Sequence, residues 1–197
     1  MSAQGVNKNR RRVLVAATSV VGAVGAVYVA VPFIASMNPS AKARAAGAPV
    51  EADISKLEPG AILRVKWRGK PVWVVHRTEK MLQLMSELEP MLADPESNAS
   101  EQPEYCKNKH RSIKEQFLVA TGICTHLGCS PSFRPEVAPE DLGADWRGGF
   151  FCPCHGSRFD LAGRVYKGVP APTNLVIPKH TFVSDSLILV GEDGGAA

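Results

Sequence analysis

Two short runs, CTHLGC at Cys124–Cys129 and CPCHGS at Cys152–Ser157, hold four of the five cysteines and two of the five histidines of the chain. A structural zinc site usually takes ligands of one kind at each spacing, such as C-x-x-C followed by H-x-x-x-H. Here each run supplies both kinds, as Cys-x-His in the first and Cys-x-x-His in the second. The pattern therefore predicts a metal site with mixed ligands, and it leaves one surplus cysteine in each run.

The basic excess of the chain lies at its N-terminus. The formal net charge is +4, and Lys8 and the three arginines at 10–12 account for all of it. No acidic residue precedes Glu51, and the 19 Lys and Arg after residue 35 equal the 19 Asp and Glu. A neutral remainder argues against a nucleic-acid-binding surface.

Residues 13–35 are uncharged and apolar, and as a helix they would be about 34 Å long, enough to cross a hydrocarbon core of roughly 30 Å. A buried core helix and a cleaved secretory signal, with a possible site at Ala43–Ala45, are the alternatives. The apolar core of a cleaved signal has only ~7 to 15 residues, so the longer apolar stretch here favours the uncleaved anchor. The basic residues 1–12 are then cytoplasmic, and their run NRRRVL resembles a twin-arginine export signal.

Residues 36–52 are rich in Ala, Gly and Pro and predict a flexible linker. Beyond it, residues 61–67 and 71–77 predict a hairpin with the three-residue loop RGK. A helix should follow Thr78 and end at Pro90, and the polar residues 93–112, with the unpartnered Cys106, predict a surface loop. The runs FLVATG, GFFC, RVY, NLVI, HTFV and LILV then recur between turns, as in a compact antiparallel β domain.

The two motifs closely resemble those of the Rieske iron-sulfur proteins, and among them the quinol-oxidising cytochrome bc type. The basic start, single span, linker, β-rich head, helical insertion and the later run GVPAPTNL also match, so the resemblance covers most of the chain. It implies an all-β fold after the transmembrane helix: a Rieske-type antiparallel β-sandwich head at residues 53–197. The head is expected to contain, in addition, one helical insertion and a small cluster-binding subdomain at about residues 120–172.

By this resemblance, Cys124 and Cys152 bind the inner iron of one 2Fe-2S cluster, and His126 and His155 bind the outer iron. Neutral imidazoles in place of two thiolates remove negative charge, which raises the reduction potential above that of all-cysteine ferredoxins. Each imidazole keeps a second nitrogen that can carry a proton. The site can therefore take up an electron together with a proton, as quinol oxidation requires.

The resemblance assigns further residues around the cluster. It pairs Cys129 with Cys154 in a disulfide that ties the two cluster loops together, as an exported compartment permits. Ser157 should donate a hydrogen bond to a bridging sulfide, and Leu127 should lie at the tip against the quinol-site subunit, with an ordinary core leucine as the alternative. The other residues expected at the cluster are the glycines and prolines of the motifs and the covering loop: Gly128, Gly156, Pro170 and Pro172.

Phe159 departs from the higher-potential members of the family, which carry there a tyrosine whose hydroxyl bonds a ligand cysteine, here Cys124. A hydrogen bond to anionic sulfur stabilises the reduced cluster by about 1–2 kcal/mol. Its absence predicts a midpoint potential lower by ~40–90 mV.

The resemblance implies an electron-transfer subunit of ubiquinol-cytochrome c reductase, and hence part of a quinol-cytochrome c oxidoreductase. It would take one electron from ubiquinol at the cytochrome b subunit, with His155 as proton acceptor, and deliver it to a c-type haem. The complex is expected to be dimeric and to lie in a bacterial inner membrane, with the head in the periplasm. The alternatives are the Rieske subunit of another exported oxidoreductase, such as arsenite oxidase, and a tethered zinc-binding module.

Overall fold

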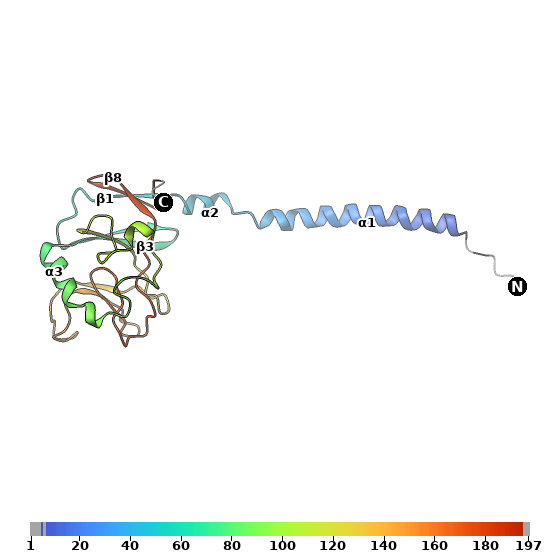
Figure 1. Cartoon of the computed structure of the whole chain (residues 1–197). Coiled ribbons are helices and arrows are strands. Elements are labelled where there is room, and N and C mark those ends of the chain that lie inside the picture. Colours follow the sequence, from blue (N-terminus) through green and yellow to red (C-terminus); the bar gives the residue numbers. More distant parts are fainter. Residues whose placement is uncertain (1–4, 6, 195–197) are drawn as a thin grey trace. The chain divides into compact units, whose positions relative to one another are not determined.

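The computed structural model describes residue 5 and residues 7–194, so part of the expected cytoplasmic segment and the last three residues lie outside the described residues. The chain divides into two compact units between Ala45 and Ala46. The first contains helix α1 (Lys8–Ser36), which begins at the N-cap Asn7 and exposes apolar side chains along its length. Among the described residues α1 lies in the one helical segment long and apolar enough to cross a membrane (Figure 1).

The segment expected to be a linker contains regular structure at both of its ends. A short helix, α2 (Ala41–Ala46), starts after Ser40, whose Oγ accepts a hydrogen bond from the backbone N–H of Ala43. Strand β1 (Val50–Asp53) then begins the head, so the expected boundary at residue 52 falls inside a strand. Residues 47–49 alone lie between these two elements.

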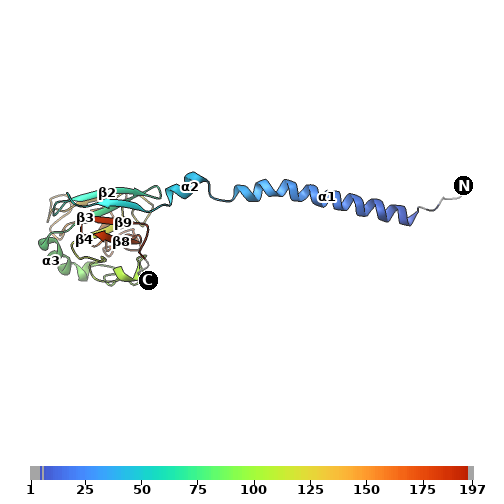
Figure 2. The ribbon, with the colours of Figure 1, turned by 90° about the horizontal axis from the view of Figure 1, so that it is seen from above.

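The head is built from three antiparallel sheets of three strands each (Figures 1 and 2). Their orders are β1-β9-β8, β2-β3-β4 and β5-β6-β7. The remaining strands are β2 (Ile62–Trp67), β3 (Lys70–His76), β4 (Phe117–Thr121), β5 (Ser132–Arg134), β6 (Gly149–Phe151), β7 (Arg158–Phe159), β8 (His180–Ser184) and β9 (Leu187–Val190). The expected all-β head with its sandwich of antiparallel sheets is confirmed.

The central sheet β2-β3-β4 supplies side chains to two cores because neighbouring residues of a strand point to opposite faces. On β3, Val72 and Val74 pack against Ile188 of the first sheet. Trp73 and its alternate neighbours face the other way, into a core shared with Phe150 and the cysteines of the motifs. The central sheet is therefore the platform on which the motif loops rest.

The β2–β3 hairpin turns through two residues rather than the expected three. Trp67 pairs with Lys70, which leaves Arg68 and Gly69 as the turn. Both have positive φ angles, 49° and 76°, the conformation of a type I′ turn. Its twist matches that of the strands, so Lys70 joins β3.

The helical insertion begins and ends where the sequence predicts. Helix α3 (Glu79–Glu87) has Thr78 as its N-cap, and the 3₁₀ turn η1 (Glu89–Met91) contains Pro90. The expectation of a surface loop at 93–112 is only partly correct: most of the segment is irregular and exposed or half-buried, but Arg111 and Cys106 of the 3₁₀ turn η2 (Glu104–Cys106) are buried, both at 0% exposure. These residues fill the space beside the central sheet, which a polar composition does not reveal.

The runs RVY and NLVI contribute no regular strand. Val165 and Tyr166 form only isolated bridges, to Phe159 and Leu92. Val176 accepts a single backbone hydrogen bond from Thr121 at 2.8 Å. Both runs are held by isolated backbone hydrogen bonds, such as those that the N–H groups of Tyr166 and Leu175 donate to the carbonyls of Arg158 and Gly163, so they do not extend a sheet.

Candidate metal centre

The two motifs form loops with the same backbone hydrogen bond. In the loop after β4, the N–H of Cys124 donates to the carbonyl of Cys129 at 2.7 Å. In the loop after β6, the N–H of Cys152 donates to the carbonyl of Ser157 at 2.8 Å. In each loop the bond joins the first cysteine to the residue five positions later. The same turn therefore occurs twice in the chain, after two different strands.

A glycine closes each turn at the same position. The N–H of Gly128 donates to the carbonyl of Cys124, and that of Gly156 donates to the carbonyl of Cys152, at 3.1 and 2.9 Å. The φ angles of the glycines are 86° and 75°, which L-residues with side chains rarely adopt. A Cβ at either glycine would meet nothing within 4 Å. The backbone conformation, and not a lack of space for a side chain, therefore requires glycine at these two positions.

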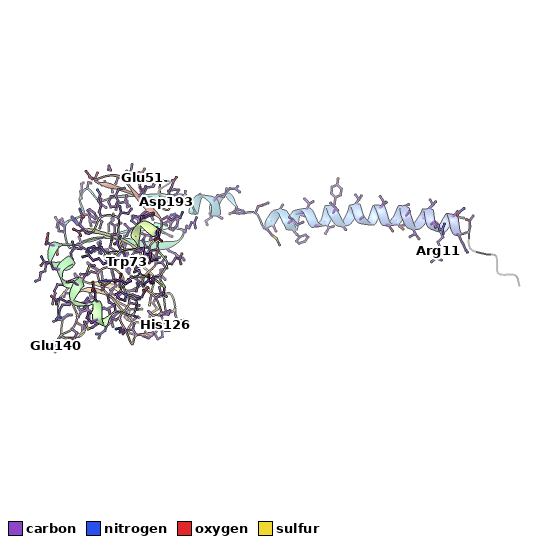
Figure 3. The ribbon with its side chains drawn as sticks, viewed as in Figure 1. Arg11, Glu51, Trp73, His126, Glu140 and Asp193 are labelled. Atoms are coloured by element: carbon purple, nitrogen blue, oxygen red, sulfur yellow. A yellow bond between two sulfur atoms is a disulfide. The ribbon has the colours of Figure 1, made fainter. Side chains whose placement is uncertain are left out.

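The first loop rests on a buried tryptophan of β3. The ring of Trp73 lies so close to Gly122 that any Cβ there would clash with it. Trp73 also stacks on Phe150 of β6, with ring centroids 4.9 Å apart (Figure 3 labels Trp73). One ring thus supports the strands that lead into both loops. A glycine two residues before Cys124 is the signal that could have indicated this contact.

The four expected ligands come together as two pairs that differ in exposure. Cys124 and Cys152 are buried, with 3% and 2% of their surface exposed, and they contact each other within one core. The rings of His126 and His155 lie outside them, nearly perpendicular, with centroids 4.8 Å apart. His155 is exposed and His126 half-buried. The sulfur donors thus lie inside and the imidazoles outside, which is the arrangement that the resemblance implies.

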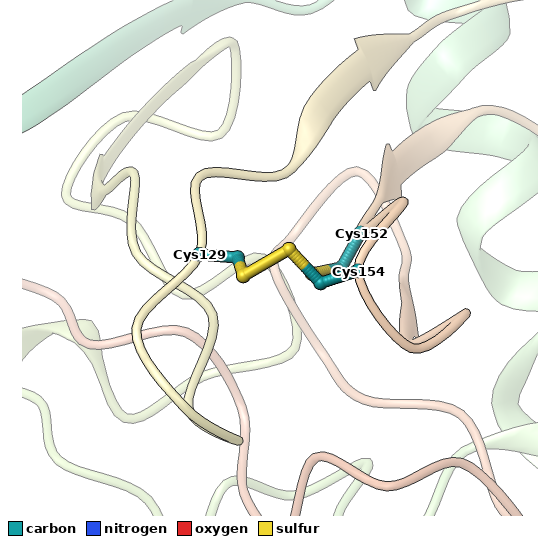
Figure 4. A group of neighbouring side chains, drawn as sticks. All are labelled: Cys129, Cys152 and Cys154. Atoms are coloured by element: carbon teal, nitrogen blue, oxygen red, sulfur yellow. A yellow bond between two sulfur atoms is a disulfide. The ribbon is translucent and has the colours of Figure 1, made fainter.

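Cys129 and Cys154 form the disulfide that the resemblance implies (Figure 4). Their sulfur atoms and that of Cys152 lie within 4.8 Å of one another. This trio is not itself a metal site, because sulfurs bonded to each other are not thiolates. The disulfide covers the ligand cysteines and joins one loop to the other across 25 residues of sequence.

A third loop, residues 168–173, is bonded to both cluster loops. The N–H of Ala171 donates to Oγ of the buried Ser157 at 3.1 Å, and Oγ1 of Thr125 donates to the carbonyl of Thr173 at 2.7 Å. The flanking prolines expected at the cluster, Pro170 and Pro172, are exposed, and Ala171 between them is buried. Ala171, and not the prolines, is therefore the residue of this loop that packs over the site. Leu127 projects from the tip of the first loop with 71% of its surface exposed, so it is not a core leucine.

Known proteins share these features over the full length of the chain. Residues 93–181 match the Rieske [2Fe-2S] domain, and residues 1–40 match the twin-arginine (TAT) signal of the ubiquinol-cytochrome c reductase Fe-S subunit. The ubiquinol-cytochrome c reductase iron-sulfur subunit of Allochromatium vinosum is 75% identical over 197 residues, covering 100% of this chain and 95% of that protein. The chain belongs to this family of iron-sulfur subunits.

A more distant curated relative agrees. The ubiquinol-cytochrome c reductase iron-sulfur subunit of Blastochloris viridis is 45% identical, covering 96% of this chain and 97% of that protein. A solved hyperthermophilic respiratory complex III chain aligns at 25% identity with a TM-score of 0.48, over 90% of this chain and 98% of that one. The curated relatives favour the quinol-oxidising family over an arsenite oxidase subunit, and membership implies partnership in a bc complex. The export-signal match and the apolar helix fit an exported, membrane-anchored head.

Rieske subunits carry one 2Fe-2S cluster, and the residues of this chain fit it. Cys124 and Cys152 are buried thiols outside any disulfide. Burial raises the pKa of the Cys124 thiol, while a backbone hydrogen bond from His126 opposes the shift. A buried thiol of this kind becomes a thiolate when a metal replaces its proton. The pair would hold one iron, and the two outer imidazoles the other.

A buried ionic network behind the second loop was missed from the sequence. Asp160 pairs with Arg164 at 2.7 Å, and both side chains are almost fully buried. The guanidinium of Arg111 donates to the carbonyls of Ala162 and Gly163 at 3.3 Å, and that of Arg77 donates to the carbonyl of Leu161. These arginines fasten the turn after β7 to the helical insertion. Charged residues spread over 88 positions carry no local pattern that would predict such a cluster.

Proposed function

We propose that this chain carries single electrons from ubiquinol, oxidised at a cytochrome b subunit, to the haem of a c-type cytochrome within a dimeric bc complex. Membership of the family supports this function. The observation that carries it is the exposure gradient at the site, from buried Cys124 and Cys152 to exposed His155 and Leu127. Of the four expected ligands the two imidazoles are the more exposed, so a substrate would approach the site from their side.

When bound, the 2Fe-2S cluster supplies a one-electron acceptor whose potential is raised by its two neutral imidazole ligands. The proposed task of Cys124 and Cys152 is to hold the iron that is shielded from water. His126 and His155 would each use one ring nitrogen for the other iron. The Cys129–Cys154 disulfide and Ala171 exclude water from the inner side of the site.

His155 is the proposed proton acceptor. Its exposed ring can accept a hydrogen bond from a quinol hydroxyl through the nitrogen that does not bind iron. The neighbouring imidazole of His126 is half-buried and so less open to the same partner. Leu127, beside them, would pack against the apolar wall of the quinol site. The proton and the electron would then leave the quinol at one place.

The proposed membrane topology follows from charge and connection. The basic residues before α1 favour a cytoplasmic N-terminus, which puts the head in the periplasm beside a bacterial inner membrane. The residues after α1 would act as a hinge, so that the head moves between the cytochrome b subunit and the c-type haem. Tethering keeps the electron donor and acceptor at high effective concentration for each other.

Electron paramagnetic resonance of the reduced protein in its native membrane tests the proposal. A spectrum of mixed nitrogen and sulfur ligation that shifts when a quinol-site inhibitor is added is expected. Leu127→Ala should keep the spectrum but diminish the shift, because the packing contact is lost. Val183→Ala, which also shortens an exposed apolar side chain but lies in β8, is the matched control and should change neither. A spectrum indifferent to the inhibitor would refute quinol oxidation at this site.

A further inference from the structure

The head has a groove beside the first cluster loop, and its lining reaches Cys124 and Thr125 at one end. It has a volume of about 550 Å³ and lies between the β2–β3 turn, residues 101–103 and residues 176–179. Its walls are mainly apolar, with Trp67, Pro103, Ile123, Val176 and Pro178 among the lining side chains. A groove of this composition is suited to a flexible apolar chain.

Positively charged side chains line one edge of this groove. The guanidinium of Arg68 lies over the Trp67 ring, 4.6 Å from its centroid, and Lys70 is the first residue of β3 after the turn. Lys179, on the opposite wall, is paired with Asp193 at 2.7 Å. Glu101 is the one carboxylate among the residues lining the groove. Arg68 and Lys70 therefore leave positive charge at the edge.

The groove lies near the point where the chain coming from α1 enters the head. A Cβ at Gly191 would meet the indole of Trp67, so the indole packs directly on this backbone. Gly191 follows Val190, which pairs with Val50, the first residue of β1. Residues 37–49 separate α1 from β1, and fully extended they could span at most roughly 45 Å. The groove therefore lies beside the strand through which the head is tethered.

We propose that this groove binds an anionic phospholipid of the membrane in which the chain is anchored. The acyl chain would lie against Trp67, Ile123 and Val176, and the phosphate would be bound by Arg68 and Lys70. Charge complementarity favours an anionic headgroup over a zwitterionic one, and a half-buried tryptophan suits the boundary between apolar and polar layers. Binding would rest the head on the membrane surface, which adds a lipid-dependent position to its movement.

Tryptophan fluorescence can test the proposal with the full-length, cluster-loaded chain in lipid nanodiscs. Trp73 and Trp146 are buried, with 2% and 0% exposure, whereas Trp67 is half-buried at the groove. Bromine atoms on the acyl chains of the lipid quench only nearby indoles. The fluorescence of Trp67 is obtained by subtracting the emission of the Trp67→Phe variant from that of the parent protein. It should be quenched in brominated phosphatidylglycerol and preserved in brominated phosphatidylcholine.

Charge variants show whether the cations bind the lipid. Arg68→Asn keeps the turn, because asparagine accepts the positive φ before Gly69, and Lys70→Gln keeps the length of the side chain. Each should lower the ratio of docked to free heads about fivefold, the effect of one cation near an anionic surface. Lys80→Gln, on α3 and outside the groove, is the matched control and should leave quenching unchanged.

Three results would overturn the proposal. Equal quenching in the two lipids would mean apolar contact without anion recognition. Equal loss in Lys80→Gln would mean a diffuse charge effect. No quenching in phosphatidylglycerol would exclude the lipid and favour a protein as the partner of this groove. Because no arm depends on quinol turnover, failure here leaves the proposed electron-transfer function untouched.

Discussion

The backbone N–H of Ala171 donates a hydrogen bond of 3.1 Å to Oγ of Ser157. With that oxygen used as an acceptor, the hydroxyl proton remains available to donate, and hydrogen bonding by Ser157 acts to lower the pKa of the neighbouring Cys124 thiol, which burial raises. One contact therefore closes the third loop over the site and orients a donor towards the ligand set.

Ser157→Ala should lower the midpoint potential by ~40–90 mV, because loss of a hydrogen bond to an anionic acceptor destabilises the reduced state by about 1–2 kcal/mol. Protein-film voltammetry measures the shift. Ser184→Ala removes an exposed hydroxyl from β8 and serves as the control with no expected change. An unchanged potential in Ser157→Ala would exclude the donor role.

Phe159→Tyr should raise the midpoint potential by ~40–90 mV if its hydroxyl reaches the Cys124 sulfur. Phe159 is fully buried in the same core as both ligand cysteines, so the new hydroxyl would be shielded from water. Phe182→Tyr places a hydroxyl in β8, away from the site, and should leave the potential as it is. If both variants give the parent value, the lower-potential hypothesis is wrong.

Replacing Cys129 and Cys154 together by alanine should cost about 2–5 kcal/mol of stability and make the cluster labile, because the two loops lose their covalent link. Iron and acid-labile sulfide per chain, followed over time after purification, report the loss. Cys106→Ala, which removes a buried thiol outside the site, should retain its iron. Equal retention in all three proteins would contradict a protective role for the disulfide.

Asp160→Asn should lower the free energy of unfolding by about 3–5 kcal/mol, since it leaves the buried Arg164 guanidinium without its counter-charge. Asp185→Asn breaks an ion pair with Lys114 in which the aspartate is fully exposed, and should cost at most ~1 kcal/mol. Urea unfolding followed by circular dichroism compares them. Similar losses in the two variants would show that the buried pair contributes no more than a surface pair.

Acidification should destabilise the head through His180. Burial lowers the pKa of this histidine, and its hydrogen bond to the Pro178 carbonyl only partly opposes the shift. Between the lowered pKa and about 6.5, the folded state binds fewer protons than the unfolded state, so the free energy of unfolding falls as the pH drops through this window. Above about 6.5 the contribution is fully present.

Urea titrations between about pH 7.5 and 5.5 measure this slope. His180→Gln should flatten it, because glutamine does not titrate in that range. Burial also lowers the pKa of His110, so a residual slope is expected in the variant. Identical slopes in the parent and the variant would rule His180 out as its source.

Local patterns predicted most of the elements correctly. Thr78 and Pro90 marked the ends of the insertion helix because capping and the missing proline N–H act within a few residues. The burial of Cys106 and Arg111 within the loop at 93–112 was not predicted, because it depends on distant partners. Asp160 and Arg164 are only four residues apart, but their burial depends on distant partners such as the Met85 carbonyl, so the sequence did not reveal the pair as part of the core.

The sequence by itself determined the ligand types, the two glycine turns and the apolar helix. Each depends on the chemistry of residues that lie a few positions apart, so short runs are sufficient. Only the tertiary structure decided that Cys124 and Cys152 are buried while His126 and His155 reach the surface. The two loops start from different strands, β4 and β6, and are brought together by packing of the sheets around Trp73. Exposure and mutual orientation follow from that packing, which no short stretch of sequence contains.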